Sequence, residues 1–147
     1  MVNIVFLLLL LALLGCGGGD SAEKFAQEGV AHFQKQEYDQ AIASYEKALK
    51  LEPKAAAVYN LLGMAYRMKY HQLGKPELRQ KEIEAFEKAI DLDPRSWVAP
   101  FNLGATYYFM GEKAKAAPLF RKALELNPEH PEKAQVEKMI AEGEKQP

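Results

Sequence analysis

The nonapeptide Tyr45-Glu-Lys-Ala-Leu-Lys-Leu-Glu-Pro53 recurs twice, as Phe86-Glu-Lys-Ala-Ile-Asp-Leu-Asp-Pro94 and Phe120-Arg-Lys-Ala-Leu-Glu-Leu-Asn-Pro128. Each copy opens with an aromatic residue, carries an alanine three positions later and ends in proline. Pro94 and Pro128 are 34 residues apart, and so are Gly29 and Gly63 upstream. A fixed step of this length is typical of arrays in which each small unit buries its apolar surface against its neighbours.

Alignment on these positions divides the chain into three units, 22–55, 56–96 and 97–130. The distance from glycine to proline is 24 residues in the first and third units and 31 in the second. The second unit therefore carries an insertion of seven residues, at about 69–79. This segment is either an elongated helical hairpin with a longer turn or a loop that contacts a partner.

The apolar spacing predicts two helices in each unit and one more at the C-terminus. Glycine and alanine at fixed points allow close helix crossings, with an aromatic ring filling the space opposite. The proline after each Leu-x-Leu-x or Ile-x-Leu-x stretch ends a helix, because the residue before proline disfavours the α conformation. The expected helices are 22–34, 38–51, 56–70, 77–92, 97–110, 113–126 and 131–143.

This pattern resembles the tetratricopeptide repeat, a helix–turn–helix unit of 34 residues. The resemblance covers residues 22–130 and implies an all-α fold, a short right-handed solenoid of three repeats. Residues 131–147, rich in charge, are expected to form a capping helix and a tail. One departure is Glu82, which stands where Ala41 and Ala116 supply a small side chain.

The same resemblance implies that the first helix of each repeat lines a concave groove. Large apolar side chains there are typical of a binding site, and the amides and Arg67 could bind a peptide backbone or carboxylate. Some of these residues are expected to pack beneath the capping helix or neighbouring repeats instead. The clustered Lys and Asn residues with which some family members clamp a chaperone carboxylate are absent. The candidate groove residues are Gln27, Val30, Phe33, Asn60, Leu61, Met64, Arg67, Met68, Phe101, Asn102, Ala105 and Tyr108.

Eleven apolar residues, Ile4 to Leu14, precede the repeats. This run has the length of a signal-peptide core and is short of the ~20 residues that a membrane span needs. Leu13-Leu14-Gly15-Cys16 resembles the lipobox of bacterial lipoproteins, although Leu14 is bulky and Met1-Val2-Asn3 lacks Lys and Arg.

The lipobox resemblance implies that residues 1–15 are a signal peptide and that Cys16 becomes the acylated (palmitate-type) first residue. Residues 16–21 would then form a Gly-rich tether. An uncleaved hydrophobic anchor, or an ordinary secretory signal cut after Gly15 or later, remains an alternative. In a Gram-negative host, Gly17 in place of Asp resembles the sorting signal of enterobacterial lipoproteins that go to the outer membrane, which implies a position there on the periplasmic side.

Composition argues against several classes of function. The 19 Lys and Arg residues are dispersed among 20 Asp and Glu residues, so a nucleic-acid interface is not expected. The single Cys excludes a disulfide framework, and His32, His71 and His130 lack metal-ligand spacing. The sequence holds no nucleophile–base arrangement and no phosphate-binding glycine loop. We therefore expect no catalytic residues, no metal, no cofactor and no enzymatic activity.

The sequence thus predicts a protein-binding module: a membrane-tethered adaptor or assembly factor in the bacterial cell envelope. Its partner would be a peptide or helix bound in the concave groove, and the chain would be a monomer or a weak homo-oligomer. The alternative is a self-associating structural module, secreted or anchored without lipid.

Overall fold

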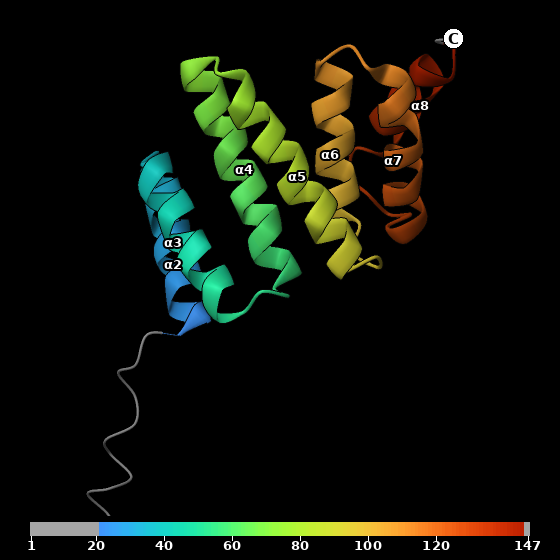
Figure 1. Ribbon diagram of the computed structural model, residues 1–147. Coiled ribbons are helices and arrows are strands. Elements are labelled where there is room, and N and C mark those ends of the chain that lie inside the picture. The colour runs from blue at the N-terminus through green and yellow to red at the C-terminus, as the bar shows by residue number, and fades with distance from the viewer. Residues whose placement is uncertain (1–20, 146–147) are drawn as a thin grey trace, which may run out of the picture.

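The computed structural model describes residues 21–145, which form seven α-helices and no strands. Consecutive helices pack as hairpins, α2 with α3, α4 with α5 and α6 with α7, and the hairpins stack side by side (Figure 1). The predicted all-α solenoid is therefore confirmed. The helices are α2 (Ala22–Gln34), α3 (Tyr38–Leu51), α4 (Ala56–Leu73), α5 (Pro76–Leu92), α6 (Val98–Phe109), α7 (Lys113–Leu126) and α8 (Lys133–Glu144).

Within each hairpin, a glycine of the first helix faces a fully buried aromatic ring of the second. In the second hairpin, a Cβ atom built on Gly63 would lie 2.7 Å from Cε1 of Phe86, well inside van der Waals contact. The recurring glycine and aromatic residue therefore set how closely the two helices approach. The pairs are Gly29 with Tyr45, Gly63 with Phe86, and Gly104 with Phe120.

The insertion in the second unit lengthens both of its helices, as the elongated hairpin predicts. The prediction of a longer turn between them is wrong. Helices α4 and α5 have 18 and 17 residues, against 13 and 14 in the first hairpin. Only Gly74 and Lys75 connect them. Gly74 ends α4 in the left-handed conformation with φ 65°, and Pro76 occupies the first turn of α5. Glycine after a helix and proline at the start of the next make a sharp reversal without a loop.

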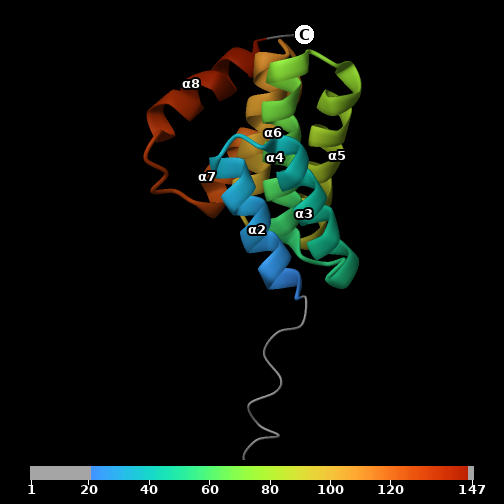
Figure 2. The same ribbon diagram turned by 90° about the vertical axis from the view of Figure 1, so that its left-hand side faces the viewer.

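The last helix, α8, begins two residues later than predicted and packs against α7. Val136 is 1% exposed, and Gly143 allows α8 to approach the α7 backbone at Lys113. Figure 2 shows α8 on the same side of the molecule as α2, with α3 and α5 on the other side. Helix α8 therefore closes the end of the stack on the side of the first helices.

At the N-terminal end, Ser21 caps α2, since its Oγ accepts the Lys24 N–H at 3.1 Å. Ser21 is thus a helix cap, which corrects its assignment to the tether. Residues 1–20, with the predicted signal peptide and Cys16, lie outside the described residues. Within 21–145, none of the helices combines the length and apolarity needed to cross a bilayer.

Candidate functional site

The predicted groove residues lie on α2, α4 and α6, and none of them is fully buried. Gln27 is exposed and the other eleven are half-buried. Val30, Phe33 and Leu61 pack at the edge of the core formed by the first two hairpins. That these side chains together line one groove stays a prediction, and three local arrangements among them differ in chemistry.

The first arrangement is an amide pair between α4 and α6. Nδ2 of Asn102 donates to Oδ1 of Asn60 at 2.9 Å. Asn60 Nδ2 has only a long contact of 3.9 Å with the sulfur of Met64, and Asn102 Oδ1 accepts no hydrogen bond from the described residues. The pair thus retains unused amide N–H donors and an unused carbonyl oxygen, the complement of a peptide C=O and N–H.

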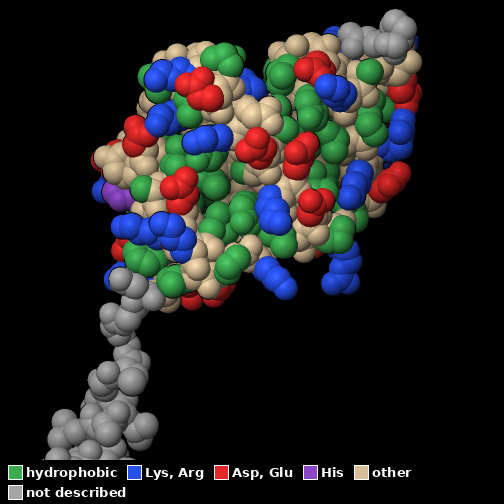
Figure 3. Space-filling model, in the orientation of Figure 1, with side chains coloured by type: hydrophobic (Ala, Val, Ile, Leu, Met, Phe, Trp, Pro, Cys, Tyr) green, Lys and Arg blue, Asp and Glu red, His purple; other side chains and the backbone are tan. Residues whose placement is uncertain are grey.

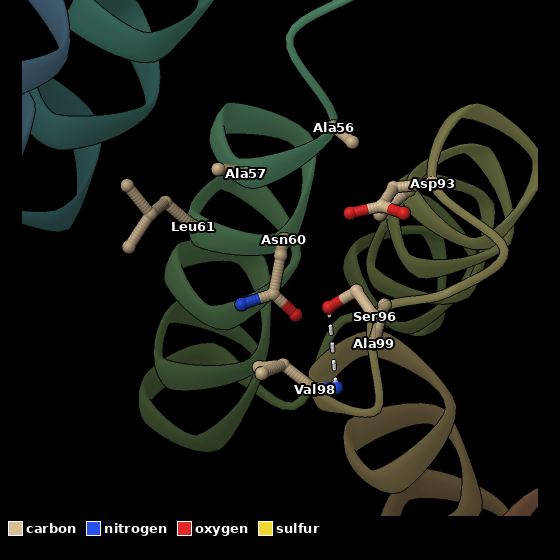
Figure 4. A pocket seen from close by; sticks show the side chains of 9 residues that line it. Ala56, Ala57, Asn60, Leu61, Asp93, Ser96, Val98 and Ala99 are labelled. Carbon is tan, nitrogen blue, oxygen red and sulfur yellow. Dashed lines mark hydrogen bonds between the residues drawn. The ribbon is translucent and has the colours of Figure 1, made fainter. Parts of the chain in front are cut away.

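Beside this pair lies a pocket of about 260 Å³, which we call the Asn60 socket. Figure 4 shows the Asn60 amide directed into the space between α4 and the Ser96–Val98 segment. Its walls are mainly apolar and come from α4, from the end of α5 and from the start of α6. The volume and the apolar walls of the socket suit one bulky apolar side chain. The lining residues are Ala56, Ala57, Asn60, Leu61, Ala89, Asp93, Ser96, Val98 and Ala99.

The second arrangement is a buried ionic network around Glu82, whose side chain is 0% exposed. One carboxylate oxygen accepts from Arg67 Nε at 2.7 Å and Thr106 Oγ1 at 2.6 Å, and the other accepts from Arg79 Nη1 at 2.6 Å. Nη2 of Arg67 also donates to the carbonyl oxygen of Asn102 at 2.7 Å. Arg67 therefore ties α4 to α5 and α6, and it holds the backbone that carries the amide pair.

Sequence reasoning missed this network and treated Arg67 only as a partner contact. Its one signal was Glu82, a charged residue at a position where a small side chain is expected. A carboxylate buried there must be paired with cations and hydrogen-bond donors. A partner contact by Arg67 stays a prediction, but most of its guanidinium is already engaged within the protein.

The third arrangement is the cover that α8 places over the third repeat. Phe101, Ala105 and Tyr108 pack against the cluster built around Val136 of α8. The ring of Phe101 lies 4.7 Å from that of His130, in the turn before α8. These three predicted groove residues are therefore partly covered by α8 and by the turn before it.

A hydrogen-bonded triad fastens the end of α8. Glu142 Oε2 accepts from the Tyr108 hydroxyl at 2.6 Å and from Lys113 Nζ at 2.8 Å. The Lys113 ammonium, followed by the Tyr108 hydroxyl, lowers the pKa of the Glu142 carboxyl. The same contacts with Glu142 raise the pKa of Tyr108 and that of Lys113.

The predicted groove residues carry almost no net charge. Arg67 is the one charged residue among the twelve, and Glu82 neutralises it. Across residues 21–145, no group of three or more His, Cys, Asp or Glu side chains is placed to hold a metal ion.

Two family models match the chain: a "TPR repeat" model at residues 29–69 and a "Tetratricopeptide repeat" model at residues 101–130. The mouse (Mus musculus) protein O-mannosyl-transferase TMTC1 is 32% identical over 98 residues, 67% of this chain and 10% of that protein. The wheat (Triticum aestivum) Hsp70-Hsp90 organizing protein is 31% identical over 111 residues, 76% of this chain and 18% of that protein. The chain thus spans about a tenth to a fifth of these curated relatives.

Solved structures show the same fold. The crystal structure of MamA superposes with a TM-score of 0.72 at 27% identity, covering 84% of this chain and 68% of MamA. The first TPR of Spaghetti (RPAP3), bound to the HSP90 peptide SRMEEVD, gives a TM-score of 0.68 at 20% identity, covering 82% and 94%. The stacked hairpins, their glycine–aromatic contacts and these matches agree, and the described part of this chain has the all-α fold of stacked tetratricopeptide repeats.

Proposed function

We propose that this protein is a non-catalytic adaptor that binds a partner segment along the open groove of α2, α4 and the start of α6. The Asn60–Asn102 pair carries the proposal, because it leaves unpaired amide groups and its member Asn60 lines an apolar socket. A peptide in the groove would hydrogen-bond to these amides through its backbone and place one side chain in the Asn60 socket.

The charge of the groove residues indicates what net charge the bound peptide has. The peptide in the Spaghetti complex, SRMEEVD, has three acidic residues among its last four. This groove offers no unpaired cation among its twelve predicted residues, since Glu82 holds Arg67. Its ligand is therefore a segment without net negative charge that carries a large apolar residue.

The buried network supports this function by fixing the geometry of the site. Arg67 bonds at once to Glu82 on α5 and to the Asn102 carbonyl on α6. The spacing of Asn60 and Asn102 is thereby held before a ligand arrives. A site formed in advance loses less conformational entropy on binding than a flexible one.

The N-terminal sequence adds a location to the proposal. With Cys16 acylated after removal of residues 1–15, the repeats would be tethered to a membrane of the bacterial cell envelope, on the periplasmic side of the outer membrane in a Gram-negative host. A labelled fatty acid fed to cells should be incorporated into the full-length chain and not into Cys16→Ala. Equal labelling of both proteins would contradict the lipid anchor and leave groove binding unaffected.

Binding of a partner segment in the groove is tested by placing a large side chain in the Asn60 socket. Ala57 is exposed at the socket, whereas Ala43 is exposed on α3, away from it. In titrations with a segment of the native partner, Ala57→Trp should weaken binding at least about tenfold, and Ala43→Trp should leave it unchanged. If the two variants bind equally, the socket is not part of the recognition surface.

A further inference from the structure

A second, shallower depression of about 420 Å³ lies between α5 and α7 and is separate from the groove. Its floor contains Ile90, Leu103 and Leu119, and Glu87 and Asp91 lie at its α5 side. We call it the α5–α7 cleft. Figure 3 shows hydrophobic side chains next to acidic ones on the face where α5 and α7 lie.

The acidic side of this cleft is unpaired. Glu87 and Asp91 lie one helical turn apart on α5, both exposed, and neither forms an ion pair or hydrogen bond with the described residues. Lys115, on the opposite side, is paired with Glu112 at 2.5 Å. The cleft therefore presents two free carboxylates above an apolar floor.

An equivalent depression one repeat earlier provides an internal comparison. It is lined by Glu46, Leu62 and Tyr66, which are each 41 residues before Glu87, Leu103 and Tyr107. There the Tyr66 hydroxyl donates to Glu46 at 3.1 Å, so this carboxylate has a partner within the protein.

In the α5–α7 cleft the corresponding residue, Tyr107, does not hydrogen-bond to Glu87. The Tyr107 hydroxyl makes no hydrogen bond with the described residues. Burial, followed by the nearby Glu87 carboxylate, raises the pKa of Tyr107. The hydroxyl and the carboxylates thus face the same space without bonding to each other.

We propose that the α5–α7 cleft binds an arginine side chain of a partner segment, at a site distinct from the groove. The methylene groups of the arginine would cover Ile90, Leu103 and Leu119. Its guanidinium would donate to Glu87, Asp91 and the Tyr107 hydroxyl, three acceptors that suit its several planar donors. The adaptor would then hold a neutral apolar segment on one face and a basic segment on another.

The test uses the full-length chain in neutral detergent, with its isoleucine δ1 methyl groups labelled for NMR. Ile90 reports on the cleft, while Ile42 in the first core and Ile140 on α8 serve as internal controls. The probes are acetyl-Gly-Arg-Gly-amide and the same peptide with citrulline, the uncharged isostere of arginine. We expect a saturable shift of the Ile90 methyl with the arginine peptide, and an affinity for citrulline at least about fivefold weaker.

Two variants make the result specific. Glu87→Gln with Asp91→Asn should reduce the arginine affinity to that for citrulline, whereas Glu84→Gln, on the same helix and bonded to Gln80, should not. Equal binding of the two peptides, or an unchanged affinity in the double variant, would overturn the proposal. An Ile90 shift that follows protein concentration without peptide would also overturn it, because the occupant would then be a second copy of this chain. None of these outcomes depends on the Asn60 socket.

Discussion

Replacing Glu82 by alanine sets two physical arguments against each other. Ala41 and Ala116 occupy the same repeat position, so alanine restores the pattern of the other units. Substitutions toward such a consensus commonly stabilise a protein by ~0.5–2 kcal/mol. The structure predicts the opposite sign, because Glu82 is the one carboxylate among residues 21–145 that pairs with Arg67 and Arg79.

The expected loss of stability in Glu82→Ala follows from the burial of the carboxylate and from the number of hydrogen bonds that it accepts. The Glu82 carboxylate is fully buried and accepts three hydrogen bonds of 2.6–2.7 Å. Removal of one partner from a buried ion pair typically costs ~3–5 kcal/mol. The side chains of Arg67 and Arg79 are 21% and 14% exposed, so water can hydrate them partly. We therefore expect a loss at the lower end, about 3 kcal/mol.

Urea unfolding followed by circular dichroism measures this loss on the full-length chain. With a slope of ~1–3 kcal/mol per molar, the midpoint should fall by ~1–3 M. Glu84→Ala, on the same helix but exposed, is the matched control and should change stability by no more than ~0.5 kcal/mol. A Glu82→Ala protein as stable as the wild type, or more stable, would refute the network as a source of stability.

Two further predictions concern the packing and the cap. Gly63→Ala should destabilise the fold by up to ~2 kcal/mol in the same urea assay. Overpacking against buried Phe86 costs ~1–3 kcal/mol, which outweighs the ~1 kcal/mol by which alanine favours a helix over glycine. An unchanged urea midpoint would mean that α4 and α5 can move apart without cost. The Glu142 contacts with Tyr108 and Lys113 stabilise α8 above the ordinary carboxyl pKa and are lost as the pH falls through the lowered pKa of Glu142. The Ile140 methyl resonance should therefore shift in acid in the wild type, and Glu142→Gln should abolish this step; an identical acid titration in both proteins would contradict the assignment.

The hairpins could be predicted from the sequence because their determinants are local. Pro94 ends α5 and Gly63 meets Phe86 within one unit, so a pattern of residue types indicates both features. The insertion could not be assigned in the same way. Its length is visible in the spacing, but whether the extra residues join the helices or the turn depends on how Gly74 and Pro76 end and restart them.

The sequence predicts which side chains the first helices present at the candidate site, but not the contacts that these side chains make with other helices. Helical spacing identifies the side chains that the first helices present, among them Asn60 and Asn102. The sequence predicts that some of these side chains pack beneath the capping helix, but it does not indicate that Tyr108 is one of them, since its bond to Glu142 joins residues 34 positions apart in different helices. The socket residues Asp93 and Ser96 were missed for a related reason, because the end of α5 and the following turn reach the groove only when the hairpins stack.

Site-specific photo-crosslinking can show whether the groove binds a neutral segment at the Asn60 socket. A photoreactive side chain is placed at Ala57, or at Ala43 as the control, in the full-length chain in membranes of its native host. We expect the photoreactive side chain at position 57 to crosslink one partner segment without net negative charge, and the one at position 43 not to crosslink it. We also expect Asn102→Ala to reduce the yield and a synthetic copy of the segment to compete. Equal crosslinking from both positions, or capture of an acidic C-terminal segment at position 57, would contradict the binding of a neutral segment at the Asn60 socket.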